Sequence, residues 1–391
     1  MSHHSLSLCP GCGSGKLSEP LLIPDQPVIL NYRFMSTEES AGVPLRTIAV
    51  AECERCGLVF NAALEEGIVP YDHRYENRQS HSEAFAKHTA QVAKMIGAVI
   101  DRDTPHLLEV GCGKGEFLRK MVDYCSGSGE GWDTSYEGSD QDGAVTFHRD
   151  YLSPEKVHGQ FDAVICRHVV EHVAAIGKFL EELVAIAREG GSSHIFIETP
   201  RLEWILENKS AWDIFYEHCN YFTEASLACL CRKAGFKVLG QFPVFAMQYQ
   251  FLVLSLDNIL SIPGYESPSR PFDCINHLRE IQSYSMQRLS DLISNARNEA
   301  PWAIWGAGAK GVCLANRLPS AGLVQVIDTN TAKQGFYIPG THIPIVAPSH
   351  DSIKHLGLIV IANPAYEREI QNMLNTFNYA GGVLVLTENL L

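Results

Sequence analysis

Two glycine-rich loops, each placed between an apolar run and a helical pattern, constrain this chain more than any other feature. The first, residues 111–115 (Gly-Cys-Gly-Lys-Gly), follows the apolar run 107–110, and the second, residues 306–311 (Gly-Ala-Gly-Ala-Lys-Gly), follows the run 302–305. Glycine permits positive φ and a close approach of ligand to backbone, and the helix behind it presents free N–H groups to an anionic group. Each unit therefore predicts the first strand–turn–helix of a parallel α/β sheet.

The rest of the chain divides around these two units. Residues 71–255 alternate short apolar runs with amphipathic stretches, which is typical of a parallel sheet. A loop-like stretch at 262–271 contains three prolines and separates this part from the second unit. A length of 391 residues suits two to four domains. We expect an α/β protein of three domains, at residues 1–70, 71–255 and 256–391.

Composition excludes several classes of function. The chain has 31 Lys and Arg against 45 Asp and Glu, a net charge of −14, and no basic cluster, so neither nucleic acid nor an anionic membrane surface is an expected partner. The N-terminal residues lack the pattern of a signal peptide, and no apolar stretch is long enough to span a bilayer. Twelve cysteines in this context predict a cytoplasmic protein with reduced thiols.

Four of the cysteines have the spacing of a metal site. Cys9 and Cys12 form one Cys-x-x-Cys pair and Cys53 and Cys56 another, with 40 residues between them. Two short chelating loops can direct four thiolates at one tetrahedral zinc ion, and four cysteine ligands leave no position for water. The pattern predicts a structural zinc site in residues 1–70; unrelated thiols and a redox pair are the weaker alternatives.

Acidic residues near the first loop fit a ligand that contains a nucleoside. Glu109 precedes the first glycine by two positions, and Asp133 lies about 20 residues further on, where an acid at the end of the second strand accepts hydrogen bonds from ribose hydroxyls. Asp150 could lie near an adenine amino group. His168 falls at the end of the fourth expected strand.

Residues 212–223 are dense in aromatic, acidic and imidazole groups. Glu217 and His218 follow the expected fifth strand, and with His168 and His172 they could converge at the carboxyl edge of the sheet. An imidazole can accept a proton near neutral pH, and a neighbouring carboxylate can fix its tautomer. The alternative is an aromatic core segment with a hydrogen-bonded histidine.

Residues 71–255 resemble the class I S-adenosylmethionine-dependent methyltransferases, in which a Glu-x-Gly-x-Gly-x-Gly motif opens the cofactor site. The resemblance implies that the glycines hold the methionine part, Asp133 the ribose and Asp150 the adenine. The residues expected to hold the cofactor are Glu109, Gly111, Gly113, Gly115, Asp133, Asp150 and His168. A nicotinamide-binding unit and an α/β core without a ligand remain as alternatives.

Nearly the whole chain resembles a narrower group, the three-domain C-methyltransferases that act on nucleotide-linked 4-keto-deoxysugars. The matching motifs are the two cysteine pairs, the Glu-His pair before Tyr-Phe-Thr, and the second glycine loop. The resemblance implies a zinc domain, a methyltransferase domain and a C-terminal Rossmann-like domain. It makes His218 the base, Glu217 its partner, His172 a polar group facing the sugar and Tyr75 a lid residue, with Tyr216 a further catalytic candidate.

This chain departs from that group in two places. Phe215 stands where the group has a tyrosine, and residues 245–250 replace a glycine-rich stretch. An O-methyltransferase acting on a sugar or another small molecule therefore stays open. So does a zinc-ribbon interaction protein with a degenerate methyltransferase domain, although the intact first loop speaks against it.

The second glycine loop has two interpretations. Its spacing, with Asp328 lying 20 residues beyond Gly308, is that of a dinucleotide fingerprint. The unit is short for a two-lobed dinucleotide fold, and Lys310 suits a phosphate cluster equally well. We expect Gly306, Gly308 and Lys310 to bind the substrate. A bifunctional methyltransferase–ketoreductase with a nicotinamide here, or a purely structural loop, is the alternative.

Overall fold

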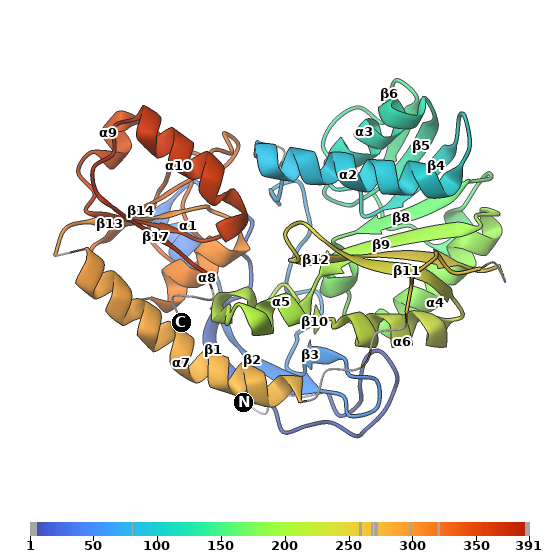
Figure 1. Cartoon of the computed structure of the whole chain (residues 1–391), viewed down its shortest axis with the longest axis horizontal. Coiled ribbons are helices and arrows are strands. Elements are labelled where there is room, and N and C mark those ends of the chain that lie inside the picture. The colour runs from blue at the N-terminus through green and yellow to red at the C-terminus, as the bar shows by residue number, and fades with distance from the viewer. Residues whose placement is uncertain are drawn as a thin grey trace.

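The structure is a computed structural model that describes residues 6–79, 81–257, 260–266, 269, 273–297, 299–318 and 321–387. Two α/β lobes lie side by side, and a small antiparallel sheet joins them below (Figure 1). The first lobe contains the first glycine loop and the second lobe the second loop. Within these residues no helix is both long and apolar enough to cross a membrane.

The central lobe is built on an eight-stranded sheet with the order β11-β12-β9-β8-β4-β5-β7-β6. Its core is parallel, whereas β12 runs antiparallel to both of its neighbours. The strands are β4 (His106–Val110), β5 (Ser128–Trp132), β6 (Gln141–Asp142), β7 (Val145–His148), β8 (Ala163–Arg167), β9 (His194–Pro200), β11 (Lys237–Val244) and β12 (Tyr249–Ser255).

Helices cover both faces of this sheet. Helices α2 (Glu83–Ile100) and α3 (Glu116–Cys125) share one core with every second residue of the strands, and α4 (Ile176–Glu189) and α6 (Glu224–Ala234) share the other. On β4, for example, Leu107 enters the first core and Leu108 the second. Strands buried on both faces read as continuous apolar runs, which is why the sequence pattern identified them.

The C-terminal lobe has a five-stranded sheet, all parallel, with the order β15-β14-β13-β16-β17. Its strands are β13 (Trp302–Trp305), β14 (Leu323–Ile327), β15 (Ile345–Val346), β16 (Leu358–Ile361) and β17 (Gly382–Val385), and its helices are α8 (Ala309–Arg317), α9 (His350–Ile353) and α10 (Glu367–Thr376). Helix α7 (Cys274–Ala296) packs its first turns on the N-terminal sheet and its later turns on this lobe.

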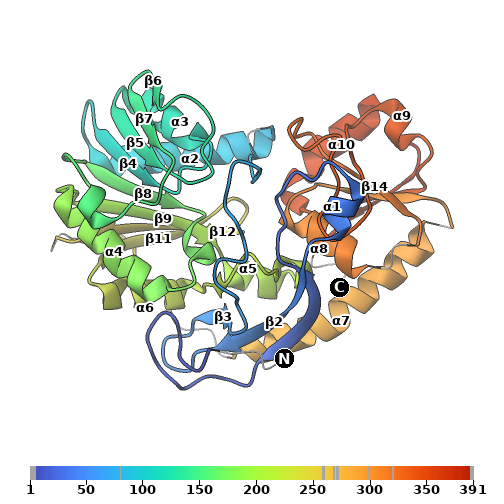
Figure 2. The ribbon, with the colours of Figure 1, turned by 180° about the vertical axis from the view of Figure 1, so that it is seen from behind.

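The N-terminal sheet connects all parts of the molecule. It consists of β1 (Leu21–Pro27), β2 (Leu45–Glu52), β3 (Val59–Asn61) and β10 (Asn220–Tyr221), so its fourth strand comes from far along the chain. Helix α1 (Thr37–Ala41), between β1 and β2, lies against the C-terminal lobe (Figure 2), where Ser40 bonds the backbone of Gly340 and Thr341. The expected boundary at residue 70 thus marks a change of sheet without separating an independent packing unit.

Candidate functional site

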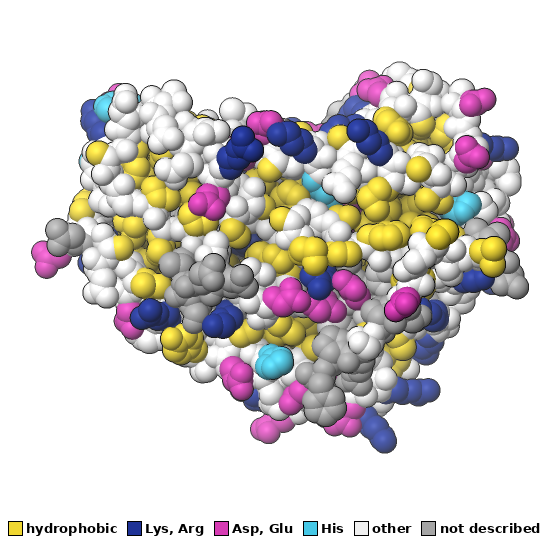
Figure 3. All heavy atoms as spheres, viewed as in Figure 1, with side chains coloured by type: hydrophobic (Ala, Val, Ile, Leu, Met, Phe, Trp, Pro, Cys, Tyr) yellow, Lys and Arg dark blue, Asp and Glu magenta, His cyan; other side chains and the backbone are white. Residues whose placement is uncertain are grey.

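A cavity of about 1030 Å³ lies between the two glycine loops, where the carboxyl ends of both parallel sheets face each other. Its lining carries eight Lys or Arg and nine Asp or Glu, whereas the whole chain has 31 against 45. The cavity is therefore less acidic than the protein around it. Figure 3 shows Lys and Arg side chains along the upper edge of the molecule, where its surface dips between the lobes.

The two glycine loops have the same relation to the acid that follows the next strand. The Gly113 amide donates to Asp133 Oδ2 (2.8 Å), and the Ala307 amide donates to Asp328 Oδ2 (2.6 Å). The second oxygen of each aspartate accepts from the amide two residues further on, at 2.7 Å in both cases. Each acid is thus fixed at the carboxyl end of its sheet, beside the turn where α/β folds bind ligands.

The glycines of the first loop differ in what they do. All three have positive φ, and a Cβ at Gly113 would meet no atom within 4 Å, so this residue borders open cavity. A Cβ at Gly111 would lie 2.2 Å from Val169. A Cβ at Gly115 would lie 2.4 Å from the Phe147 ring, and Gly115 does not line the cavity. Gly115 lets α3 pack on the sheet, and its contact with the cofactor stays a prediction.

Glu109 lies on the cavity wall with an unsatisfied carboxylate oxygen. The residue is 2% exposed, and Oε2 has no hydrogen-bond partner among the described residues. Burial, only partly opposed by Arg167, raises the pKa of Glu109 to about 7. A buried acceptor without a partner is costly, so this position suits a cationic ligand group such as an α-ammonium.

Asp150 and His168 both line the cavity. Asp150 is exposed and pairs with Lys156 at 2.6 Å. The His168 nitrogens lie 3.5 Å from carboxylate oxygens of Glu171 and Glu198. Burial opposes protonation, but these two acids outweigh it and raise the pKa of His168 to about 9. Nε2 of His168 has no hydrogen-bond partner among the described residues, and the residue lines the cavity, so its contact with the cofactor stays a prediction.

His218 and His172 meet at right angles on the cavity wall, with ring centroids 4.7 Å apart. His172 Nδ1 bonds the Glu217 carbonyl oxygen (2.9 Å) and lies 3.0 Å from the Tyr71 hydroxyl. The His218 ring packs on the Phe215 ring, with 4.2 Å between the ring centroids. His218 makes no hydrogen bond within the described part of the chain. Burial, together with the nearby His172, His168 and Lys310, lowers the pKa of His218 well below its usual value, so its imidazole is neutral.

Glu217 faces away from His218. Its carboxylate accepts from the Leu30 amide (2.6 Å), the Tyr75 hydroxyl (3.0 Å) and the Asn31 side chain (3.4 Å). The predicted Glu217–His218 pair is thus absent from the described contacts. The Glu217 carboxylate instead holds Tyr75 and the residues that follow β1, Leu30 and Asn31, at the cavity.

Tyr216 lies outside the cavity. Its ring is fully buried in the core beneath the N-terminal sheet, and its hydroxyl accepts from the Glu65 amide at 2.9 Å. Tyr216 is therefore a structural residue, and the prediction that it is catalytic is wrong.

The second loop brings Gly306, Gly308 and Lys310 to the cavity. A Cβ at Gly308 would meet no atom within 4 Å, so the start of α8 is open to a ligand. The Lys310 ammonium forms an ion pair with Asp213 and lies 4.5 Å from the Trp204 ring centroid.

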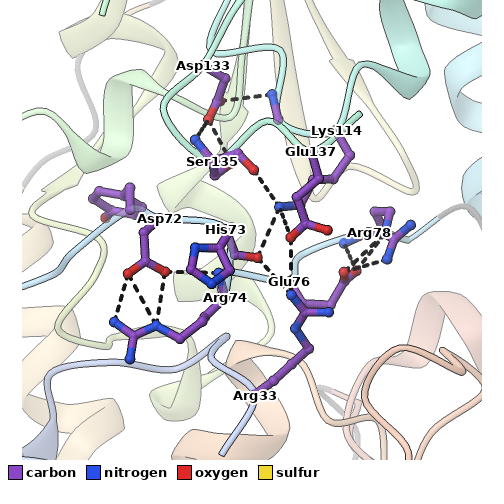
Figure 4. Close-up of polar contacts among 12 residues, drawn as sticks. Arg33, Asp72, His73, Arg74, Glu76, Arg78, Lys114, Asp133, Ser135 and Glu137 are labelled. Atoms are coloured by element: carbon purple, nitrogen blue, oxygen red, sulfur yellow. Dashed lines mark hydrogen bonds and ion pairs between the residues drawn. The ribbon is translucent and has the colours of Figure 1, made fainter. Parts of the chain in front are cut away.

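The segment 71–78 crosses from the N-terminal sheet to the first glycine loop (Figure 4). Lys114 of that loop donates to the His73 carbonyl oxygen (3.4 Å) and pairs with Glu137 (3.0 Å), and Arg33 bonds the same two groups. Glu76 is fully buried and pairs with Arg78 at 2.6 Å. These contacts hold the segment, and with it Tyr71 and Tyr75, over the cavity.

Several cavity residues were not predicted from the sequence. Tyr71 begins a Tyr-x-x-x-Tyr pattern that could have identified it beside Tyr75. No local sequence pattern identifies Asn31 or Lys333 as a cavity residue. Lys333 is 6% exposed, and its ammonium donates to the Asn31 side-chain oxygen (3.0 Å) and to the Ala307 carbonyl oxygen (2.9 Å).

The four cysteines of the N-terminal part lie together. Their sulfur atoms are all within 4.8 Å of one another, with 3.6 Å between Cys9 and Cys56 and 3.5 Å between Cys12 and Cys53. Tetrahedral zinc with four thiolates requires sulfurs about 3.8 Å apart. The donor set and its size fit zinc. Glu171, His172 and His218 also offer three ligand atoms within 4.8 Å, in the cavity itself.

Two protein families match parts of this chain, and both are families of methyltransferase domains. The family described as a methyltransferase domain matches residues 74–241, and the one described as a C-methyltransferase C-terminal domain matches residues 275–387. The protein is a methyltransferase. This methyltransferase has the predicted class I Rossmann-like α/β fold with an additional C-terminal domain.

Solved structures with similar folds are distant in sequence. One is magnesium protoporphyrin IX methyltransferase from Synechocystis PCC 6803 with bound SAH, 15% identical over 44% of this chain and 84% of that chain, with a TM-score of 0.35. Another is 1,6-didemethyltoxoflavin-N1-methyltransferase from Burkholderia thailandensis, 16% identical over 44% and 80%, with a TM-score of 0.33. No curated protein matches the chain.

Proposed function

We propose that this methyltransferase methylates a carbon atom next to the ketone of a nucleotide-linked sugar, after His218 has removed a proton from that carbon. The observation that carries the proposal is the state of His218: a neutral imidazole without a hydrogen bond among the described residues, in a cavity lined by both glycine loops. A neutral imidazole within reach of substrate is the form that a general base requires.

The first loop is assigned to the cofactor. Gly113 leaves room for the methionine part, Asp133 accepts from ribose hydroxyls at the rim, and Glu109 pairs with the α-ammonium group. The bound cofactor supplies an electrophilic methyl group. Burial of Glu109 makes this pairing favourable, because it replaces a missing hydrogen bond in a site with little water.

The second loop is assigned to the nucleotide part of the substrate. The open backbone at Gly306 and Gly308 stands at the start of α8, where free amides favour an anionic group. The buried Lys333 adds a positive charge beside Ala307. Asp328, held like Asp133, is the matching acceptor for sugar hydroxyls.

The tyrosines and His172 orient the acceptor in this proposal. Burial raises the pKa of both Tyr71 and Tyr75 well above the usual value, so their hydroxyls stay protonated and act as donors. The Glu217 carbonyl oxygen fixes the His172 ring through Nδ1. His218 is then the group best suited to accept the proton.

Zinc and the domain division belong to the same proposal. We assign a structural zinc ion to Cys9, Cys12, Cys53 and Cys56, within a zinc-binding domain at 1–70 that precedes a methyltransferase domain at 71–255 and a Rossmann-like domain at 256–391. Gly13 and Gly57 support the assignment, since each follows its pair with φ near 75° (75° and 76°) and bonds the first cysteine's carbonyl oxygen. The ion would hold β3 in place. Strand β3 pairs with β10, and β10 begins two residues beyond His218.

Proton exchange tests the proposal before any methyl transfer. A nucleoside diphosphate-linked 4-keto-6-deoxyhexose is incubated with the protein and S-adenosylhomocysteine in D₂O, and its α-protons are followed by NMR. The native protein should exchange one α-proton, and His218→Asn should slow the exchange by ~10²–10⁴-fold. Tyr216→Phe, in the same segment but outside the cavity, is the control. No exchange with the native protein, or an exchange rate that is unchanged in His218→Asn, would contradict the proposal and favour an O-methyltransferase.

A further inference from the structure

Lys310 lies in the wall of the cavity. It belongs to the second glycine loop, and its ammonium pairs with Asp213 and lies 4.5 Å from the Trp204 ring centroid, both in the segment between β9 and β10. Asp213 is itself fixed, because its other oxygen accepts from the Ser210 hydroxyl. The segment between β9 and β10 therefore holds the Lys310 ammonium in the cavity wall.

The same segment of chain holds Lys310 and His218. Asp213 precedes His218 by five residues, and Phe215 between them packs on the His218 ring. All four residues line the cavity. Lys310 and His218 thus lie on the wall of one cavity and are both held by this segment.

The proposed reaction creates a negative charge on the carbonyl oxygen of the substrate. When the carbon gives its proton to His218, the C–H electron pair forms the carbon–carbon double bond of an enolate and the carbonyl π pair moves onto oxygen. The enolate carbon then bonds the methyl carbon while the sulfur–methyl bond breaks and its electron pair stays on sulfur. The enolate oxygen needs a donor throughout the first step.

We propose that Lys310 is a catalytic residue that donates a hydrogen bond to the enolate oxygen, and does not serve as a ligand of the substrate phosphates. This inference rests on the proposed C-methylation. An ammonium has three N–H donors, of which Asp213 takes one. Trp204 covers part of its remaining surface, so a donor is left for the cavity. The C-terminal lobe thereby supplies a group to the chemistry as well as a wall to the cavity.

Three variants test this assignment. Lys310→Met removes the charge, Lys310→Arg keeps it, and Lys354→Met is the control, because Lys354 is an exposed lysine of the same lobe that pairs with Asp351. With the 4-keto-6-deoxyhexose nucleotide as probe, Lys310→Met should lower kcat about 10²–10³-fold with KM nearly unchanged. Lys310→Arg should recover part of kcat, and Lys354→Met should behave as the native protein.

A second measurement does not depend on the substrate. Histidine pKa values are followed by NMR in the ligand-free protein, with His168 and His172 as the other imidazoles that face His218. Removing the Lys310 charge should raise the pKa of His218 in Lys310→Met and leave it unchanged in Lys354→Met. A raised KM with an unchanged kcat, or an unmoved His218 pKa, would overturn the inference. A native protein that neither exchanges nor methylates the probe refutes the proposed function and the enolate role together, even if the pKa of His218 moves.

Discussion

The pairing of Glu109 with the cofactor's ammonium group makes cofactor binding depend on pH in a specific way. The pKa of Glu109 is about 7 in the protein alone, and an α-amino group has a pKa of about 7.8. Binding needs the ionised acid and the protonated amine. At pH 7.4 the two fractions are each ~0.7, which gives a product of ~0.5, whereas at pH 6 they are ~0.1 and ~1, which gives ~0.1.

We therefore expect the affinity for S-adenosylmethionine to fall about five-fold from pH 7.4 to pH 6 and to pass through a maximum near pH 7.4. Isothermal titration calorimetry across this range measures it directly. Glu109→Gln should bind more weakly at pH 7.4 and lose the acid limb. Glu130→Gln, on the neighbouring strand and paired with His148, should keep it. An affinity that is flat from pH 6 to 7.4 in the native protein, or an acid limb that survives in Glu109→Gln, would refute the role given to Glu109.

Three other predictions concern metal, cofactor and stability. Metal analysis should find about one zinc per chain, and Cys53→Ser should lose this zinc. The variant should also turn over more slowly, because β3 would no longer hold β10 in place, while its affinity for the cofactor stays the same. A zinc content that does not change in the variant would contradict the cysteine site. Gly113→Val should abolish cofactor binding, whereas Gly143→Val, with the same positive φ away from the cavity, should not; equal effects would mean that backbone strain alone is responsible. Protonated His168 contributes fully to the free energy of unfolding below pH 6.5, and this contribution is lost as the pH rises through about 9. Urea titrations over this range should show the native protein losing up to ~3 kcal/mol of unfolding free energy that His168→Asn does not lose.

The sequence was most informative where a signal is local. A glycine turn between an apolar run and a helix carries its own geometry, so the positions of Gly113, Gly308 and the acids Asp133 and Asp328 at the sheet edges follow from the sequence alone. The four cysteines were equally predictable, because chelating spacing is a local property.

The orientation of neighbouring side chains was not predictable. Tyr216 and Glu217 are adjacent, yet one points into the core below the N-terminal sheet and the other toward the cavity. The difference depends on β10 joining a sheet whose other strands lie more than 150 residues earlier in the chain. Contacts of this kind, such as Glu217 with Leu30 or Lys333 with Asn31, depend on tertiary packing alone.

The position of the transferred methyl group tests the central claim most directly. The protein is incubated with a nucleoside diphosphate-linked 4-keto-6-deoxyhexose and S-adenosylmethionine labelled with ¹³C in its methyl group, and the product is examined by NMR. We predict that the native protein places the label on the carbon next to the carbonyl, with the loss of one α-proton, and that His218→Asn does not. A label bound to oxygen, or a carbon-bound label that forms equally fast in His218→Asn, would contradict the account.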